Sequence, residues 1–91
     1  MKILPDYQRL TIQYPSTIIV KRLIGISRTI DLDNDLAYWE EKLRINRGQR
    51  SRILLLNSTK GYVTYSDSNN LEKYERLYHL LKNRCPALEA R

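Results

Sequence analysis

Within residues 7–14, the hydrophobic residues Leu10, Ile12 and Tyr14 alternate with polar ones, so this segment is expected to be a strand with one exposed face. Pro15 and Ser16 then break the pattern. Residues 17–32 are rich in β-branched residues and are interpreted as one long strand or as two strands that bend near Gly25. A partly helical interpretation of the same segment stays open. The residues expected on the exposed face of the first strand are Arg9, Thr11 and Gln13.

Residues 33–47 are predicted to form a helix. Asp33 or Asn34 can cap its start, and Gly48 is placed to end it. Acids near the start and bases near the end suit the helix dipole. The apolar residues of this stretch recur at helical spacing: Leu36, Trp39 and Leu43.

A hairpin and a second helix are predicted to complete the chain. Residues 53–56 are consecutive aliphatics, which indicates a central strand covered on both faces, and a five-residue loop ending in Gly61 joins it to a strand at 62–65. Asn69 and Glu72 match a capping box, and Pro86 marks the helix end. The apolar stripe of this helix is Leu71, Tyr74, Leu77, Tyr78 and Leu81.

These elements predict an α+β fold: a single antiparallel sheet of about four strands with two helices on one face, in the order β-β-α-β-β-α. The 91 residues are expected to make one small domain, 1–91, with residues 86–91 as a frayed tail. The longest apolar runs have four residues or fewer, too short for a signal peptide or a transmembrane segment.

Charge is sorted along the sequence. Residues 31–41 contain five acids and no base, and residues 42–60 contain six bases and no acid. Four of these bases are arginines within residues 44–52. Arginine stays protonated and its planar fork fits phosphate oxygens, and the net charge of +6 also favours acidic partners. The charge order up to Arg47 is also what a helix would favour, but the arginines beyond Gly48 need another reason.

The charge pattern predicts a small non-enzymatic domain that binds nucleic acid, RNA or DNA, through an arginine-rich loop. Seven tyrosines and no phenylalanine add side chains that can stack on bases. An alternative is a protein–protein interaction module with an acidic partner, as an assembly subunit, an inhibitor or a homodimer. The candidate nucleic-acid-binding residues are Arg44, Arg47, Arg50, Arg52, Lys60, Tyr62 and Tyr65.

Catalytic and metal-binding patterns are not found in the sequence. His79 is the one histidine and Cys85 the one cysteine, so neither a catalytic group nor a zinc ligand set is expected. The alternating acids at 31–35 lack the glycine and the distal glutamate of a calcium loop. No cofactor is expected, and the single cysteine favours a reducing compartment, so a cytoplasmic location is expected.

Residues 53–84, a hairpin followed by an amphipathic helix, resemble the closing segment of pleckstrin-homology-like domains. They are also similar to the end of the Alu-binding proteins of the signal recognition particle and to the second half of homing-endonuclease-like folds, whose acidic catalytic motif is missing here. The resemblance covers about a third of the chain. The first of these similarities implies a pleckstrin-homology-like fold for the interaction module.

Overall fold

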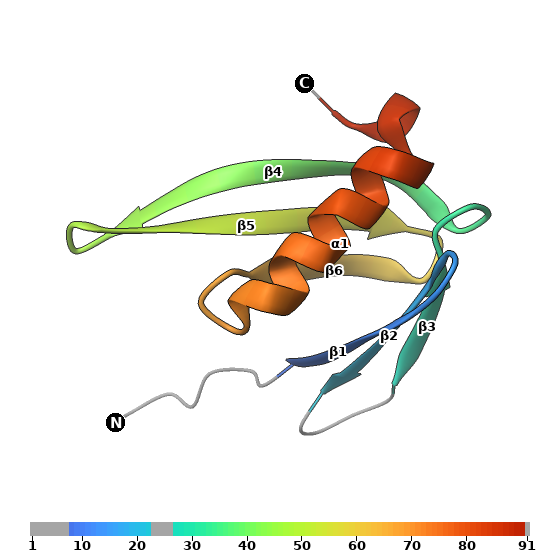
Figure 1. The fold of residues 1–91 in the computed structure, drawn as a ribbon, viewed down its shortest axis with the longest axis horizontal. Helices are drawn as coiled ribbons and strands as arrows, with labels where there is room; N and C mark the ends of the chain where they lie inside the picture. Colours follow the sequence, from blue (N-terminus) through green and yellow to red (C-terminus); the bar gives the residue numbers. More distant parts are fainter. Residues whose placement is uncertain (1–7, 23–26, 91) are drawn as a thin grey trace.

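The computed structural model of the protein describes residues 8–22 and 27–90, which form six strands, one α-helix and a short 3₁₀ turn (Figure 1). The strands are β1 (Gln8–Gln13), β2 (Thr17–Arg22), β3 (Arg28–Asp31), β4 (Leu36–Asn46), β5 (Gln49–Ser58) and β6 (Gly61–Ser66). They are followed by α1 (Leu71–Arg84) and the 3₁₀ turn η1 (Pro86–Leu88). The α+β class is confirmed. The prediction of one sheet with two helices is wrong, because the antiparallel strands form two three-stranded sheets, β1-β2-β3 and β4-β5-β6.

The first sheet confirms the alternation predicted for the first strand. Leu10 on β1 is buried opposite Val20 on β2, while Arg9, Thr11 and Gln13 are exposed. Residues 17–32 contain two strands, β2 and β3, which pair antiparallel. The bend expected near Gly25 lies outside the described residues.

Residues 36–46 form strand β4, so the helix predicted at 33–47 is wrong. The register between β4 and β5 shifts between Leu36 and Tyr38, which is the mark of a β-bulge. The extra residue brings Leu36 onto the same face as Trp39, and both are buried. Their three-residue spacing therefore imitates a helical period.

The acids expected to cap that helix build the turn between β3 and β4 instead. The carboxylate of Asp31 accepts hydrogen bonds from the backbone N–H of Asp33 (3.0 Å) and from Nδ2 of Asn34 (2.6 Å). The carboxylate of Asp35 accepts from the backbone N–H of Asp31 (3.0 Å). Short polar side chains favour turns because they can bond to nearby backbone groups in this way.

Strand β5 is the central strand of the second sheet, as predicted, but only one of its faces is fully covered. Leu54 and Leu56 are buried, whereas Ile53 and Leu55 are partly exposed on the opposite face. The hairpin with β6 is confirmed. Its loop has two residues rather than five, because β5 extends to Ser58 before β6 begins.

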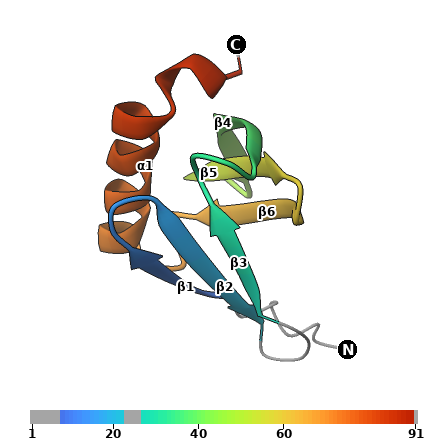
Figure 2. The same cartoon turned by 90° about the vertical axis from the view of Figure 1, so that its right-hand side faces the viewer.

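Helix α1 runs along one side of both sheets, which is clear when the molecule is seen end-on (Figure 2). Its cap is Asn70, one residue later than predicted, whose side chain accepts from the backbone N–H of Lys73 (3.0 Å). Its buried residues join those of both sheets in a single hydrophobic core. The described residues contain no helix with the length and apolar character needed to cross a membrane. The buried residues of α1 are Tyr74, Leu77, Leu80 and Leu81.

The chain after α1 lies against the start of β4. The indole N–H of Trp39 donates to the carbonyl of Cys85 (2.8 Å), and the backbone N–H of Ala90 donates to the carbonyl of Trp39 (2.8 Å). Lys82 forms an ion pair with Glu89 (2.8 Å). Residues 86–90, which we expected to fray, thus have defined contacts with the body, and Arg91 lies outside the described residues.

Candidate nucleic-acid interface

The seven predicted binding residues are spread along the second sheet. Arg44, Arg47 and Arg50 lie where β4 turns into β5, and Arg52 follows two residues later on β5. Lys60 lies in the turn at the far end of β5, Tyr62 follows it on β6, and Tyr65 lies opposite Leu54 in the middle of the sheet. Since β5 has ten residues, its two ends are about 30 Å apart. The structure therefore groups three of the arginines and leaves Lys60 and Tyr62 remote from them.

The grouped arginines lie on a two-stranded ribbon made of residues 43–51, here called the arm. Its strands pair in register from Leu43 opposite Arg52 to Asn46 opposite Gln49. The arm extends beyond α1 and the first sheet (Figure 1). Leu43, Ile45 and the three arginines are exposed, so none of these five side chains belongs to the core.

A two-residue turn closes the arm at Arg47 and Gly48. Both residues have positive φ, 51° for Arg47 and 78° for Gly48, which is the backbone of a type I′ turn. Glycine adopts this conformation readily, and asparagine is the usual residue at the first position. An arginine there costs about 1–2 kcal/mol of backbone strain. Arg47 thus occupies a position that local backbone preference would give to another residue.

The arginines of the arm point to different sides of the ribbon. Residues directly opposite each other in an antiparallel pair share a face, and successive residues alternate. Arg44 pairs with Ser51 on one face, whereas Arg50 pairs with Ile45 on the other. Leu43 shares the face of Arg50 and Ile45. Positive charge is therefore present on both faces and at the tip.

The positive charges of the arm have no acidic partner among residues 8–22 and 27–90. The ion pairs nearest to it along β4 and β5 involve Lys42, which lies 3.3 Å from Glu40, and Arg52. No carboxylate of the described residues lies within 4.0 Å of the guanidinium groups of Arg44, Arg47 and Arg50. Within the described structure, these three groups are therefore not neutralised by an ion pair.

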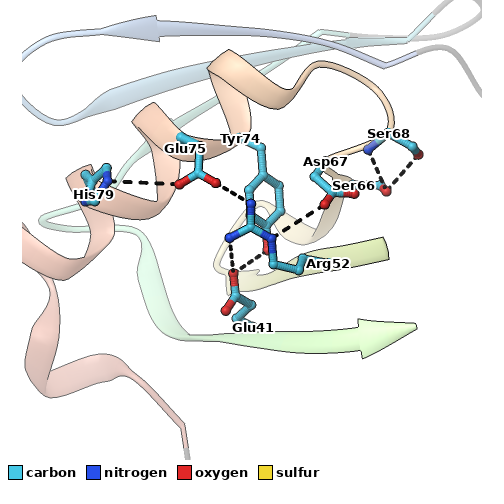
Figure 3. Close-up of polar contacts among 8 residues, drawn as sticks. All are labelled: Glu41, Arg52, Ser66, Asp67, Ser68, Tyr74, Glu75 and His79. Atoms are coloured by element: carbon cyan, nitrogen blue, oxygen red, sulfur yellow. Dashed lines mark hydrogen bonds and ion pairs between the residues drawn. The ribbon is translucent and has the colours of Figure 1, made fainter. Parts of the chain in front are cut away.

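Arg52 is held inside a cage of acidic residues at the base of the arm (Figure 3). It donates to the carboxylate of Glu75 on α1, and its Nε lies 3.5 Å from Oδ2 of Asp67. Its Nη1 lies 3.9 Å from Glu41, and its guanidinium stacks 4.9 Å from the ring centre of Tyr74. The hydrogen bond to Glu75 is the main cause that raises the pKa of Arg52.

The cage joins the base of the arm to the helix. The hydroxyl of Tyr74 on α1 donates to Glu41 on β4 (2.6 Å), next to Arg52 on β5. Burial, together with this hydrogen bond, raises the pKa of the Tyr74 hydroxyl. Three segments distant in the sequence are thereby connected through one guanidinium. Arg52, predicted to bind phosphate, already has its anions within the protein.

The two tyrosines predicted to stack on bases have opposite environments. Tyr65 is 3% exposed and belongs to the core, so its ring is covered. Tyr62 is 54% exposed, and its hydroxyl forms a hydrogen bond with that of Tyr38.

Lys60 is exposed in the neighbouring turn. Lys21 is exposed on the first sheet, and the side chain of Arg22 lies outside the described part of the chain.

The acidic block of the sequence is occupied by contacts within the protein. Arg84 at the end of α1 donates from Nη2 to Oδ2 of Asp33 (2.8 Å) and from Nε to Oδ1 (3.3 Å). These contacts hold the pKa of Asp33 below its usual value. Asp35 accepts from the hydroxyl of Thr59 (3.2 Å), which follows β5 at the end opposite the arm. The acidic turn and the basic arm are thus far apart in space.

No protein-family model, curated protein or solved structure matches this chain. The similarity of residues 53–84 to known folds therefore stays a prediction. Within residues 8–22 and 27–90, no group of three or more His, Cys, Asp or Glu side chains is placed to hold a metal ion.

Proposed function

We propose that this protein is a small, non-enzymatic nucleic-acid-binding domain that contacts phosphates with the arm. The observation that carries this proposal is the set of three exposed guanidinium groups without a carboxylate partner in the described structure. Guanidinium groups bind phosphate oxygens through paired hydrogen bonds, and neutralising phosphates releases condensed counterions. The contribution of phosphate contacts to affinity does not depend on the base sequence.

The position of Arg47 supports the same proposal. Its positive φ is a conformation in which asparagine or glycine is less strained. Backbone strain concentrates at sites that serve a function, and an observed outlier is a reason to look for one. Arg47 places a positive charge at the extreme tip of the arm, and contact with a phosphate is a function that would explain the strain.

The test is the binding of a fluorescent oligonucleotide, followed by anisotropy as a function of salt. Three phosphate contacts predict that affinity falls with a log–log slope of about −2.7, since each contact contributes about −0.9. A variant with Arg44→Gln, Arg47→Asn and Arg50→Gln is expected to lose roughly 10²- to 10³-fold in affinity at about 0.1 M salt.

A matched control removes the same charge from the body of the protein. Arg9→Gln, Lys21→Gln and Lys73→Gln change residues with no ion pair among the described side chains, and Arg9 and Lys21 are exposed on the first sheet. This variant is expected to bind within a fewfold of the wild type. Equal loss in both variants would mean that net charge, rather than the arm, drives binding. Absence of any salt-sensitive binding would reject the proposal.

A second candidate function is a protein interaction through the arm. Leu43 is 60% exposed and Ile45 is 65% exposed, and both lie on one face of the arm. An apolar pair on a protruding ribbon favours contact with another protein or with a second copy of this chain. Light scattering at increasing concentration tests the second-copy form. A dimer in wild-type protein that becomes a monomer with Leu43→Thr and Ile45→Thr would favour this function.

A further inference from the structure

We infer that the partner of the arm is double-stranded DNA, with the arm seated in the major groove; this inference rests on the proposed function. The first support is the size of the arm. Paired strands lie about 4.8 Å apart, so the backbone of the ribbon is narrow. The major groove of B-form DNA is about 12 Å wide and about 8.5 Å deep, and it admits a two-stranded ribbon. Five residues from Leu43 to Arg47 extend about 15 Å, which is enough to reach the floor of the groove.

The distribution of charge on the arm distinguishes a duplex from a single strand. Arg44 and Arg50 are on opposite faces of the ribbon, so their guanidinium groups point away from each other. A single strand has one phosphate backbone and meets one face of the ribbon at a time. The major groove has a phosphate backbone on each side. A ribbon lying in it can contact one backbone with Arg44 and the other with Arg50.

The tip of the arm suits the floor of the same groove, and Ile45 suits its side. Arg47 is the outermost side chain of the arm, and arginine pairs with the acceptors O6 and N7 that guanine presents in the major groove. Ile45 is aliphatic and exposed, and it lies about 7 Å along the strand from Arg47, within the depth of the groove. The major groove of DNA displays the thymine methyl group, which is the apolar feature that such a side chain can contact.

The same dimensions separate DNA from RNA. The major groove of A-form RNA is deep and narrow, and side chains cannot read it. Uracil also lacks the methyl group that Ile45 would contact. An arm with charge on both faces and an aliphatic side chain opposite one of its arginines therefore matches a B-form duplex better than an RNA duplex.

The test compares three fluorescent probes of the same length and A·T-rich sequence: duplex DNA, single-stranded DNA and duplex RNA. Wild-type protein is expected to bind duplex DNA at least tenfold more tightly than either of the others at about 0.1 M salt. Arg44→Gln and Arg50→Gln are each expected to weaken duplex binding fivefold to tenfold, because each removes a contact to a different backbone. Circular dichroism of each variant checks that the fold is kept.

The choice of groove is tested with netropsin, which occupies the minor groove of A·T-rich duplexes. We expect netropsin to leave the affinity of the protein unchanged within twofold, and displacement by netropsin would overturn the major-groove inference. Equal or tighter arm-dependent binding to single-stranded DNA or duplex RNA would overturn the duplex-DNA inference but leave the proposed function standing. If no probe shows salt-sensitive binding that depends on the three arginines, the proposed function itself fails.

Discussion

Arg50 and Arg52 are two residues apart on β5 and share one face of one ribbon, yet their surroundings differ in almost every respect. Arg52 stacks on Tyr74 and lies within reach of the carboxylates of Glu41, Asp67 and Glu75 (Figure 3). Arg50 is exposed and has no carboxylate partner among the described residues. The ribbon crosses the boundary of the folded body between these two positions.

This difference shows how one run of arginines can serve two purposes. At the base of the arm, a guanidinium that bonds to residues from α1 and from the loop before it stabilises the packing of helix on sheet. Beyond the base, the same chemical group has no carboxylate partner among residues 8–22 and 27–90, which favours contact with an external anion. The division depends on which carboxylates the fold brings near, not on the spacing of the arginines.

Substituting Arg52 is the strongest test of the difference between Arg52 and Arg50. Arg52→Ala deletes hydrogen bonds to charged groups and leaves three carboxylates close together, so we expect a loss of about 1–3 kcal/mol in the free energy of unfolding. Urea unfolding followed by the fluorescence of the buried Trp39, the one tryptophan, measures it. Affinity of the folded variant for duplex DNA is expected to stay within about twofold.

Arg50→Ala is the matched control, since it removes the same charge from the same strand and face. Stability is expected to change by less than about 0.5 kcal/mol, as is usual for exposed positions. Affinity is expected to fall fivefold to tenfold. If Arg50→Ala destabilises the protein as much as Arg52→Ala does, the two arginines do not differ in the way described.

Substituting Arg47 separates turn stability from binding at a single residue. Asparagine suits the first position of a type I′ turn, so Arg47→Asn is expected to raise the free energy of unfolding by up to about 1 kcal/mol while weakening duplex binding fivefold to tenfold. Arg47→Lys keeps the charge and is expected to bind within about threefold of the wild type. Wild-type affinity of Arg47→Asn would mean that the tip does not contact nucleic acid.

The pH dependence of the free energy of unfolding tests contacts of Asp33 and Asp35, which lie outside the arm. Arg84 holds the pKa of Asp33 below 3.8, and a hydrogen bond from the backbone of Asp31 does the same for Asp35. Above about pH 5 these carboxylates are ionised in both the folded and unfolded states, and their contribution is present in full. It is lost as pH falls from about 5 through the lowered pKa values, because the unfolded state takes up protons first. Arg84→Gln should show a smaller fall in the urea midpoint over this range.

Lys60 and Tyr62 are expected to give the smallest effects. They lie about 30 Å from the tip of the arm, at the other end of β5. Lys60→Gln and Tyr62→Ala should each change duplex affinity by less than about twofold. A loss from Lys60→Gln as large as that from Arg50→Gln would mean that the nucleic acid extends along the whole second sheet.

The sequence predicted elements whose hydrophobic period is undisturbed. The first strand and the last helix have such a period, and the hairpin after Arg52 is marked by its aliphatic run and by the turn residues before Gly61; all three are present within the described residues. The helix at 33–47 was wrong because a bulge at Leu36–Tyr38 shifts the period of β4 and because acids near Asp33 suit turns as well as helix caps.

The candidate site was less predictable than the fold. Opposite parity on β6 indicated that only one of Tyr62 and Tyr65 faces inward, but parity alone does not say which. The partners of Arg52 come from Asp67 and Glu75, which no local pattern connects with it. Leu43 and Ile45 alternate with polar residues, which indicates a strand, but the helical interpretation of residues 33–47 did not use this signal.

Shortening the arm is the most direct test of the claim that the body folds without it and the arm binds. Replacing residues 45–50 with Asn-Gly, together with Arg44→Thr, removes two residue pairs and so preserves the alternation of pair types at the new turn. Arg52 and its acidic partners stay in place. Urea unfolding and duplex-DNA anisotropy are both measured on the same preparation of this variant. We expect a free energy of unfolding within about 1 kcal/mol of the wild type and a loss of roughly 10²- to 10³-fold in affinity. A folded variant that binds duplex DNA like the wild type would contradict the claim.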